Sequence, residues 1–350
     1  MRSFVYNALP ARVVFGAGSV AALSDEVARL GAKRPLLLTT PGRAEMVAAV
    51  SRNLAVAGVF DRVVMHTPLE AANQARELAK KLGADCCVAV GGGSTIGFGK
   101  AIALTSALPV LAVPTTYSGS EMTTIWGISE GGAKKTGRDP KVLPRTVLYD
   151  PELTLDLPAK VSAASGMNAI AHCAEALYAH DGNPIVSLMA EEGIRALADA
   201  LPRVLKDLKN IQARGEALYG AWLAGSTIST TSVALHHKLC HVLGGSFNLP
   251  HAETHSIVLP HALRYNYDAA GAAMKKIERA VKAENAAQGI YDLEKKLGLP
   301  LRLAEIGMKQ ADLERAARIA AEAPYPNPRK VEYAPVLELL RNAYEGRRPS

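Results

Sequence analysis

The chain has 350 residues, 49% of them hydrophobic, which is enough for two domains with sizeable cores. The net charge is +7, but basic residues are dispersed and aromatic residues make up only 5%, which argues against a nucleic-acid partner. The four cysteines form no CxxC pair, and no apolar run approaches the length of a membrane span. We therefore expect a cytoplasmic protein without a signal peptide, whose positive charge is either solvated or attracts an anionic substrate or dinucleotide.

The first half of the chain alternates between short apolar runs and segments with helical periodicity. The runs predict strands at residues 12–15, 35–39, 62–66, 86–90 and 110–113. The periodic segments predict helices at 20–30, 44–57, 69–82 and 100–106. Such alternation is typical of βαβ units, so we expect an α/β domain with a largely parallel sheet over residues 1–157.

A proline-bracketed stretch at residues 150–158 marks the end of this pattern and a domain joint. Helical periodicity then predicts an all-helical domain over residues 158–350. Its expected helices lie at 161–178, 185–200, 211–231, 232–243, 274–284, 290–297 and 312–323.

A glycine-rich loop follows the predicted strand 86–90. It contains Gly91, Gly92, Gly93, Ser94 and Thr95 and precedes a predicted helix. Glycines allow a phosphate to approach the backbone closely, and a helix N-terminus offers free N–H groups to an anion. The loop is not the GxGxxG motif, and taken alone it is also compatible with an ordinary strand–helix turn.

A second polar loop, which includes Thr115, Thr116 and Ser118, follows the next predicted strand. By itself this loop could be a solvated turn rich in serine and threonine. Ligands of open parallel sheets bind at the carboxyl ends of the strands, where both loops are expected. Two such loops on consecutive strands favour a dinucleotide.

Six of the nine histidines fall within residues 236–261. Asn168 and His172 are four residues apart on a predicted helix, as are His237 and His241, and His251 follows ten residues later. This clustering indicates a functional site rather than scattered structural histidines. Neutral imidazoles can bind Zn²⁺ or Fe²⁺, but Asn168 supplies only a neutral amide, so we expect no tightly bound metal.

These segments occur in an order and spacing that resemble the iron-containing (group III) alcohol dehydrogenase superfamily, over nearly the whole chain. The matching segments are GGGSTIGFGKAIAL (91–104), VPTTYSGSEMTTIWG (113–127), SGMNAIAHCAEALYA (165–179) and LPHAETHSIVLPHALRYN (249–266). Metal-dependent members carry Asp where this chain has Asn168 and Gly97, have a longer threonine loop, and read PHG where this chain has 250–253. These departures are similar to the maleylacetate reductase subgroup.

The resemblance implies a dehydroquinate synthase-like fold, with an N-terminal dinucleotide-binding domain and an all-helical C-terminal domain, in a homodimer. It implies NADH or NADPH as cofactor, with Lys100 joining the two loops in binding it. Relatives that prefer NAD carry Asp where this chain has Thr40, with Arg43 nearby. Because Thr40 would not repel a 2′-phosphate, we expect NADPH to be accepted as well as NADH.

The implied activity is reduction of the conjugated C=C bond of maleylacetate, and of chlorinated analogues, to 3-oxoadipate during the degradation of aromatic compounds. Hydride would add to the alkene carbon β to the ketone, and imidazole groups would stabilise the enolate and deliver the proton. We assign this role to His237 first, then to His172, His241 and His251, with Asn168 as a hydrogen-bonding group.

Tyr117 and Lys238 are the residues expected to meet the dicarboxylate substrate, although a loop tyrosine and a helix lysine could equally be plain surface groups. One competing interpretation is a metal-dependent alcohol or aldehyde dehydrogenase of the same superfamily. Another is a non-catalytic dinucleotide-binding protein whose histidines pack in a core or an interface.

Overall fold

The computed structural model describes residues 4, 6, 8–9, 11–131, 133–322 and 325–350, without the side chains of residues 133 and 134. The chain divides into two compact units. One is an α/β unit formed by Leu9–Leu157 together with Lys209–Leu218, and the other is a helical unit that includes Pro158–Leu208 and Tyr219–Ser350. The short segment Lys209–Leu218, which we expected in the second domain, therefore groups with the first.

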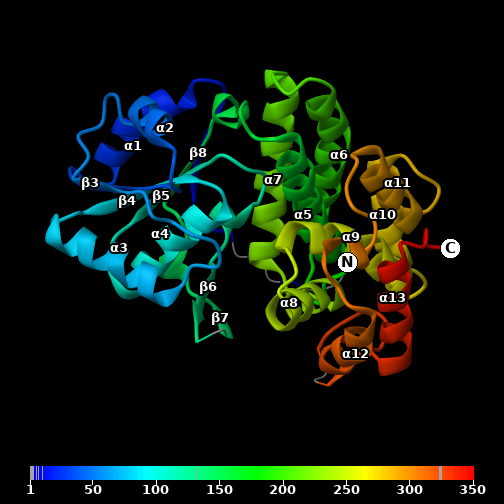
Figure 1. Cartoon of the computed structure of the whole chain (residues 1–350). Helices are drawn as coiled ribbons and strands as arrows, with labels where there is room; N and C mark the ends of the chain where they lie inside the picture. Colours follow the sequence, from blue (N-terminus) through cyan, green and yellow to red (C-terminus); the bar gives the residue numbers. More distant parts are fainter. Residues whose placement is uncertain (1–3, 5, 7, 10, 132, 323–324) are drawn as a thin grey trace. The chain divides into compact units, whose positions relative to one another are not determined.

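The α/β unit is built on a parallel sheet with the strand order β1-β8-β5-β4-β2-β3. Its strands are β1 (Arg12–Phe15), β2 (Pro35–Leu38), β3 (Gly58–Phe60), β4 (Cys86–Gly91), β5 (Val110–Pro114) and β8 (Thr146–Tyr149). Its helices are α1 (Leu23–Arg29), α2 (Ala44–Val50), α3 (Leu69–Lys81) and α4 (Gly93–Thr105). Helices α1 and α2 lie on one face of the sheet, and α3 and α4 lie on the other (Figure 1).

The central strands are continuously apolar because helices cover both of their faces. Val88 of β4 pairs with Leu37 of β2 on one side and with Leu111 of β5 on the other, and all three are fully buried. On the face of α1 and α2, these residues pack in one core with Leu23 and Val50. The parallel sheet confirms the predicted fold class for this half of the chain.

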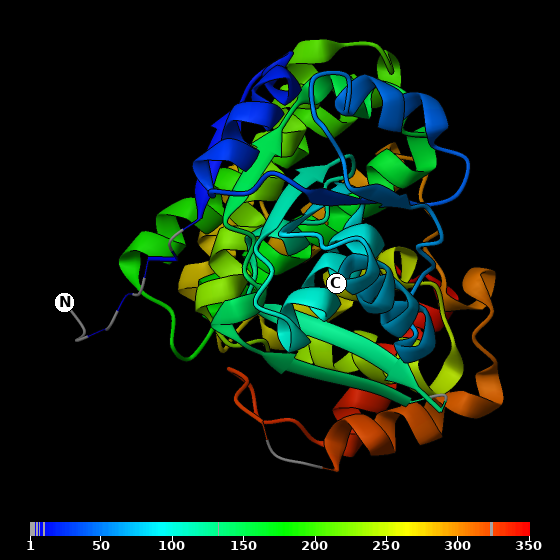
Figure 2. The ribbon, with the colours of Figure 1, turned by 90° about the vertical axis from the view of Figure 1, so that its left-hand side faces the viewer.

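One expectation for this unit was wrong, and one feature of it was not predicted. Residues 62–66 are not a strand: the third strand is β3, and the backbone turns at His66 and Thr67, which have φ angles of 64° and 46°. The structure also contains an antiparallel hairpin that the sequence analysis did not predict, formed by β6 (Ile125–Glu130) and β7 (Ala133–Arg138). This hairpin is separate from the main sheet, as the blue-green ribbon in Figure 2 shows.

Helices make up the second unit, as expected, and no strand occurs among its described residues. They are α5 (Ala159–Tyr178), α6 (Pro184–Lys206), α7 (Ile211–Thr230), α8 (Leu235–Phe247), α9 (His251–Asn266), α10 (Gly271–Val281), α11 (Ala286–Lys296), α12 (Leu313–Ala321) and α13 (Tyr333–Glu345), and α7 as far as Leu218 groups with the α/β unit. We had not predicted α9 or α13. Within the described ranges, no helix combines the length and the apolar character that crossing a membrane requires.

The α8–α9 turn sets the position of most of the histidines. Helix α8 ends at Asn248, whose φ of 54° is the left-handed conformation that stops a helix, and Pro250 then precedes α9. Leu243 and Leu249 anchor the turn in the helical core, which also contains residues of α12 and α13. As a result α8 and α9 pack against each other and bring His237 and His255 together, with ring centroids 4.9 Å apart.

Candidate functional site

The glycine loop forms an uncapped helix N-terminus. Strand β4 ends at Gly91, which has a φ of 154°, and α4 begins at Gly93 with Gly92 at its N-cap. No side chain caps this helix. The first backbone N–H groups of an α-helix have no partner within the helix, so those of Gly93, Ser94 and Thr95 face outward at its positive end. The loop therefore has the geometry that binds a phosphate.

The threonine loop lies against the glycine loop, as expected. The backbone N–H of Thr115 donates to Gly91 O over 3.0 Å. A Cβ atom at Gly92 would lie 2.9 Å from Cγ2 of Thr116, and one at Gly93 would lie 3.4 Å from Oγ of Ser118. Gly92 thus leaves no room for a side chain, which explains a glycine at a position whose φ is ordinary.

The two loops lie where the strand order reverses. The chain passes from β2 outward to β3 and then returns to β4 on the other side of β2. Ligands of open α/β sheets bind at such a switch point. Thr39 and Thr40 follow β2 directly, and the buried hydroxyls of Thr39 and Thr95 have no hydrogen-bond partner in the described part of the chain. This end of the sheet is the candidate dinucleotide site.

Lys100, which we expected to bind the cofactor, is engaged elsewhere. Its side chain is 1% exposed, and its ammonium donates to Ser120 O, Thr123 Oγ1 and Ile125 O over 2.7–2.8 Å. Three bonds use all three protons of an ammonium group, so none remains for a dinucleotide. Burial lowers the Lys100 pKa to about 7, although the Glu121 carboxylate acts in the opposite direction.

Tyr117, which we expected to meet the substrate, is fully buried in the α/β unit. Its hydroxyl accepts a hydrogen bond of 3.0 Å from Arg214, and Arg214 also donates to Leu157 O. Arg214 is itself fully buried near the start of α7. The Tyr117 ring therefore fixes the threonine loop to the segment Lys209–Leu218 of the same unit.

The histidine cluster is formed within the helical unit by α5, α8 and α9. Asn168 and His172 lie one turn apart on α5 and are 6% and 9% exposed. His237 on α8 is buried as well, whereas His241 on α8 and His251 at the start of α9 are exposed. The His172 and His237 rings stack with centroids 5.2 Å apart. The structure thus brings together the residues that the sequence analysis selected.

Buried nitrogen and oxygen atoms in this cluster lack partners. Asn168 Oδ1, His172 Nδ1 and His237 Nε2 are inaccessible and make no hydrogen bond to any residue that the structure describes. Buried polar atoms are normally paired, so such atoms point to a bound molecule. Burial lowers the His172 pKa well below its usual range, and the neighbouring His237 and His251 act in the same direction. The His172 ring is therefore neutral at pH 7.

Sequence analysis did not assign a role to Glu175, which orients His237. His237 Nδ1 donates to the buried Glu175 carboxylate over 2.7 Å. Glu175 lies three residues after His172 and so faces the same side of α5. That spacing was the signal available in the sequence, but the contact with His237 spans 62 residues and cannot be predicted from periodicity.

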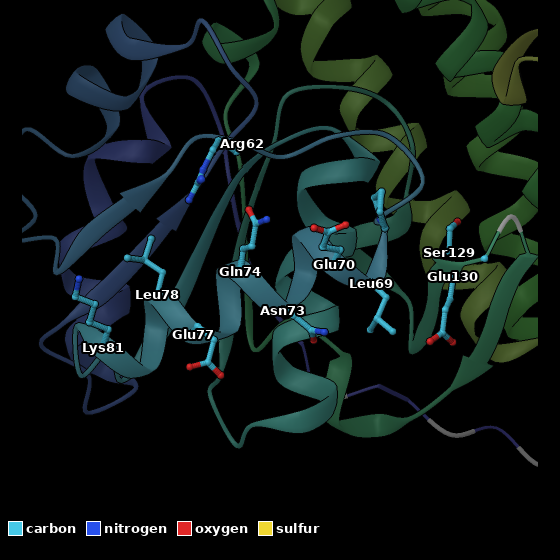
Figure 3. A pocket seen from close by; sticks show the side chains of 12 residues that line it. Arg62, Leu69, Glu70, Asn73, Gln74, Glu77, Leu78, Lys81, Ser129 and Glu130 are labelled. Atoms are coloured by element: carbon cyan, nitrogen blue, oxygen red, sulfur yellow. The ribbon is translucent and has the colours of Figure 1, made fainter.

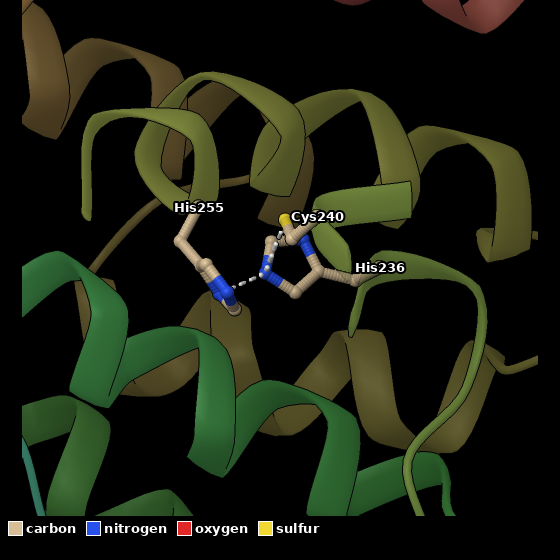
Figure 4. A group of neighbouring side chains, drawn as sticks. All are labelled: His236, Cys240 and His255. Atoms are coloured by element: carbon tan, nitrogen blue, oxygen red, sulfur yellow. Dashed lines mark hydrogen bonds between the residues drawn. The ribbon is translucent and has the colours of Figure 1, made fainter. Parts of the chain in front are cut away.

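His236, Cys240 and His255 form a buried group (Figure 4). The His236 Nε2 and His255 Nδ1 atoms are 3.0 Å apart, and Cys240 Sγ lies 3.7 Å from His236 Nε2. Burial lowers the pKa values of both histidines well below the usual range. Two neutral imidazoles sharing one hydrogen bond account for this contact. The sequence placed both histidines in the cluster, but only α9 explains why His255 turns inward.

The superfamily's name implies a bound iron ion, but the expected ligand residues, in the arrangement that the structure shows, do not fit one. Among the described residues, the only three His, Cys, Asp or Glu side chains whose ligand atoms all lie within 4.8 Å are His236, Cys240 and His255. The set formed by His172, His237 and His251 is therefore too open, and its fourth member, Asn168, is uncharged. Tight divalent-metal sites of this kind usually include a carboxylate to offset the charge.

Lys238, the other residue expected to meet the substrate, is half-buried on α8, with its ammonium 5.9 Å from the centre of the Tyr325 ring. A separate surface pocket of about 960 Å³ lies between α3 and the β6–β7 hairpin of the α/β unit (Figure 3). Its described lining includes Arg62, Glu70 and Glu77 but none of the predicted site residues. The unpaired polar atoms, and not this hollow, therefore define the candidate sites.

Comparison with known proteins agrees with these features. Residues 10–151 match the family "Iron-containing alcohol dehydrogenase", and residues 162–344 match "Fe-containing alcohol dehydrogenase family, C-terminal". A maleylacetate reductase from Burkholderia cepacia is 54% identical, with all of both chains covered. The crystal structures of maleylacetate reductases from Agrobacterium tumefaciens and Rhizobium sp. strain MTP-10005 superpose over all of both chains with TM-scores of 0.97 and 0.96, each at 48% identity.

The agreement covers both units over their full length. The chain belongs to the iron-containing alcohol dehydrogenase family and, within it, to the group that includes the maleylacetate reductases.

Proposed function

We propose that this protein is an NADH- or NADPH-dependent reductase of the conjugated C=C bond of maleylacetate, with 3-oxoadipate as its product. The observation that carries the proposal is the identity of about half of all residues, over the full length, with proteins named maleylacetate reductase. The uncapped helix at Gly93 and the buried atoms without partners at Asn168 and His237 support it.

The reaction consumes one hydride and one proton. Hydride from the reduced nicotinamide adds to the alkene carbon β to the ketone, and the electron pair of the C=C bond moves to form an enolate. The carbon next to the ketone then takes a proton, which restores the ketone and completes the saturated chain. The protein must therefore stabilise a negative charge on the ketone oxygen and supply a proton beside it.

His237 is the residue that we assign to this step. Because its Nδ1 is engaged with Glu175, Nε2 is the nitrogen left to carry the transferred proton. In the doubly protonated ring Nε2–H gives its proton to the enolate carbon, and the ring returns to the neutral form with Nδ1 still protonated. His172 is neutral and stacks on His237, so it can donate a hydrogen bond but does not act as a charged proton donor. The exposed His241 and His251 and the Asn168 amide are the remaining polar groups of this cluster.

We further propose that turnover needs no tightly bound metal, because Asn168 offers no charge to offset a divalent ion. We propose that Thr40 admits NADPH as well as NADH, and that the protein is a homodimer as the family resemblance implies. Chlorinated maleylacetates are proposed as substrates alongside maleylacetate itself.

The test is oxidation of NADH and of NADPH by the purified protein in the presence of maleylacetate. The assay is run before and after EDTA treatment, with metal content measured on the same samples. We expect activity with both cofactors that survives removal of metal. Activity that disappears with EDTA and returns with Fe²⁺ or Zn²⁺ would instead identify a metal-dependent member of the family, and tight dinucleotide binding without turnover would identify a non-catalytic one.

A further inference from the structure

Glu175 is a carboxylate with almost no access to solvent. It lies on α5 and is 1% exposed. One oxygen accepts from the backbone N–H of His236 over 2.8 Å, and the other accepts from the N–H of Ala234 over 2.8 Å and from His237 Nδ1 over 2.7 Å. Burying a carboxylate is costly unless hydrogen bonds compensate for the lost water, and here they do.

Two of these bonds have a structural explanation. Ala234 is the N-cap residue of α8 and provides no capping side chain, so Glu175 supplies the cap from another helix. Capping does not explain the third bond, because the His237 ring needs no partner to form α8.

The third bond decides which nitrogen of His237 is free. An imidazole whose Nδ1 donates to a carboxylate presents Nε2 on the opposite side of its ring. His237 Nε2 is buried and has no partner among the described residues, and His172 stacks against the ring. Asn168, two turns before Glu175 on α5, has an unpaired Oδ1 in the same cluster.

We infer that Glu175 is a positioning residue for His237, which holds Nδ1 as the protonated nitrogen and fixes Nε2 as the atom that meets the substrate. This inference rests on the proposed function, because it assigns His237 the proton-transfer step. Glu175 is 1% exposed, and the His237 ring is its partner from the proposed catalytic group. We therefore expect its effect on kcat to pass through that ring, apart from any effect of capping on stability.

Steady-state kinetics of a double-mutant cycle test this dependence. Glu175→Gln should lower kcat by about 10- to 100-fold, the usual cost of losing a carboxylate that orients a functional histidine. The KM for NADH should not change. In a His237→Asn background, Glu175→Gln should leave kcat where His237→Asn alone puts it. A kcat loss of equal size in both backgrounds would overturn the inference and leave Glu175 as a helix cap.

Asp181→Asn is the matched control, since it removes a carboxylate just after α5 that bonds to Ser232 and to no histidine ring. Its kcat should equal that of the unchanged protein. Thermal melts of all variants separate the capping effect, which should lower Tm after Glu175→Gln in both backgrounds. Glu175→Asp, which keeps the charge on a shorter side chain, should recover part of kcat.

Nitrogen-15 NMR of histidine-labelled protein provides a test that needs neither substrate nor a folded Glu175 variant. The His237 signals are identified by their loss in His237→Asn. Nδ1 should carry the proton in the unchanged protein, and an unprotonated Nδ1 would overturn the inference. If this tautomer is observed but maleylacetate is not reduced, the proposed function fails while the positioning of the ring stands.

Discussion

The α/β unit and the helical unit each contain, beside a candidate site, a buried ionisable side chain that makes three hydrogen bonds, and the two side chains are of opposite type. In the first, the Lys100 ammonium gathers three oxygen acceptors from residues 120–125. In the second, the Glu175 carboxylate gathers three nitrogen donors from residues 234–237. All three Lys100 partners are atoms of a loop segment, whereas one Glu175 partner is the ring of the proposed catalytic histidine. We therefore expect substitution of Lys100 to weaken cofactor binding and stability, and substitution of Glu175 or His237 to slow turnover.

Removal of the His237 ring should give the largest effect on activity. His237→Ala should reduce kcat by about 100- to 10,000-fold, the range for loss of a general acid or base. The dissociation constant for NADH, measured by fluorescence titration, should stay the same because the glycine and threonine loops belong to the other unit. His180→Ala, at an exposed position, is the control. Unchanged turnover in His237→Ala would remove this residue from the mechanism.

Removal of the Lys100 ammonium should affect stability most. Lys100→Met leaves Ser120 O, Thr123 Oγ1 and Ile125 O without their donor, which should lower the free energy of unfolding by about 2–5 kcal/mol. The KM for NADH should rise more than kcat falls, because residues 120–122 continue the threonine loop. Denaturant unfolding and steady-state kinetics measure the two effects, with the exposed Lys81→Met as control. A kcat loss without a change in KM would contradict the contrast between the two units.

Acid should destabilise the helical unit through its neutral histidines. Burial lowers the pKa of His261 to about 4, below the unfolded value of 6.5. The unfolded chain therefore takes up a proton below pH 6.5 that the folded chain refuses, and His261 costs about 1.4 kcal/mol of stability per pH unit until about pH 4. Denaturant titrations from pH 7 to pH 4.5 should show a slope at least this steep, because His172, His236 and His255 act in the same direction, and His261→Gln should reduce the slope by about 1.4 kcal/mol per pH unit. An identical slope in the variant would show that His261 is protonated when folded.

The sequence predicts features that depend on neighbours in the chain. The glycine loop, the apolar strand β4 and the helices α5 and α8 follow from local pattern, and so does the pairing of Asn168 with His172. Residues 62–66 illustrate the limit, because their apolar run resembles a strand. The positive φ angles at His66 and Thr67 instead end any extended segment there, and β3 forms earlier, where it can pair with β2.

The second limit of prediction from the sequence concerns interaction partners that are remote along the chain. The sequence analysis missed α9, which follows Pro250 and contains Pro260, because a proline within a helical pattern usually marks the end of a helix. Without α9, nothing indicated that His255 turns toward His236. Likewise, the acceptors that occupy Lys100 and the hydroxyl bond that occupies Tyr117 lie 20 or more residues away. The candidate residues were therefore identifiable, but which of their polar atoms remain free was not.

The shared carboxylate at Glu175 also has an evolutionary consequence. One side chain both begins α8 and orients His237, so natural selection for a durable fold and selection for a fast enzyme act on the same two oxygen atoms. A substitution at this position should lower stability and activity together, whereas substitutions at many active sites raise one at the expense of the other. Divergence of activity in this lineage should therefore arise from the side chains around the His237 ring and not from the residue that holds it.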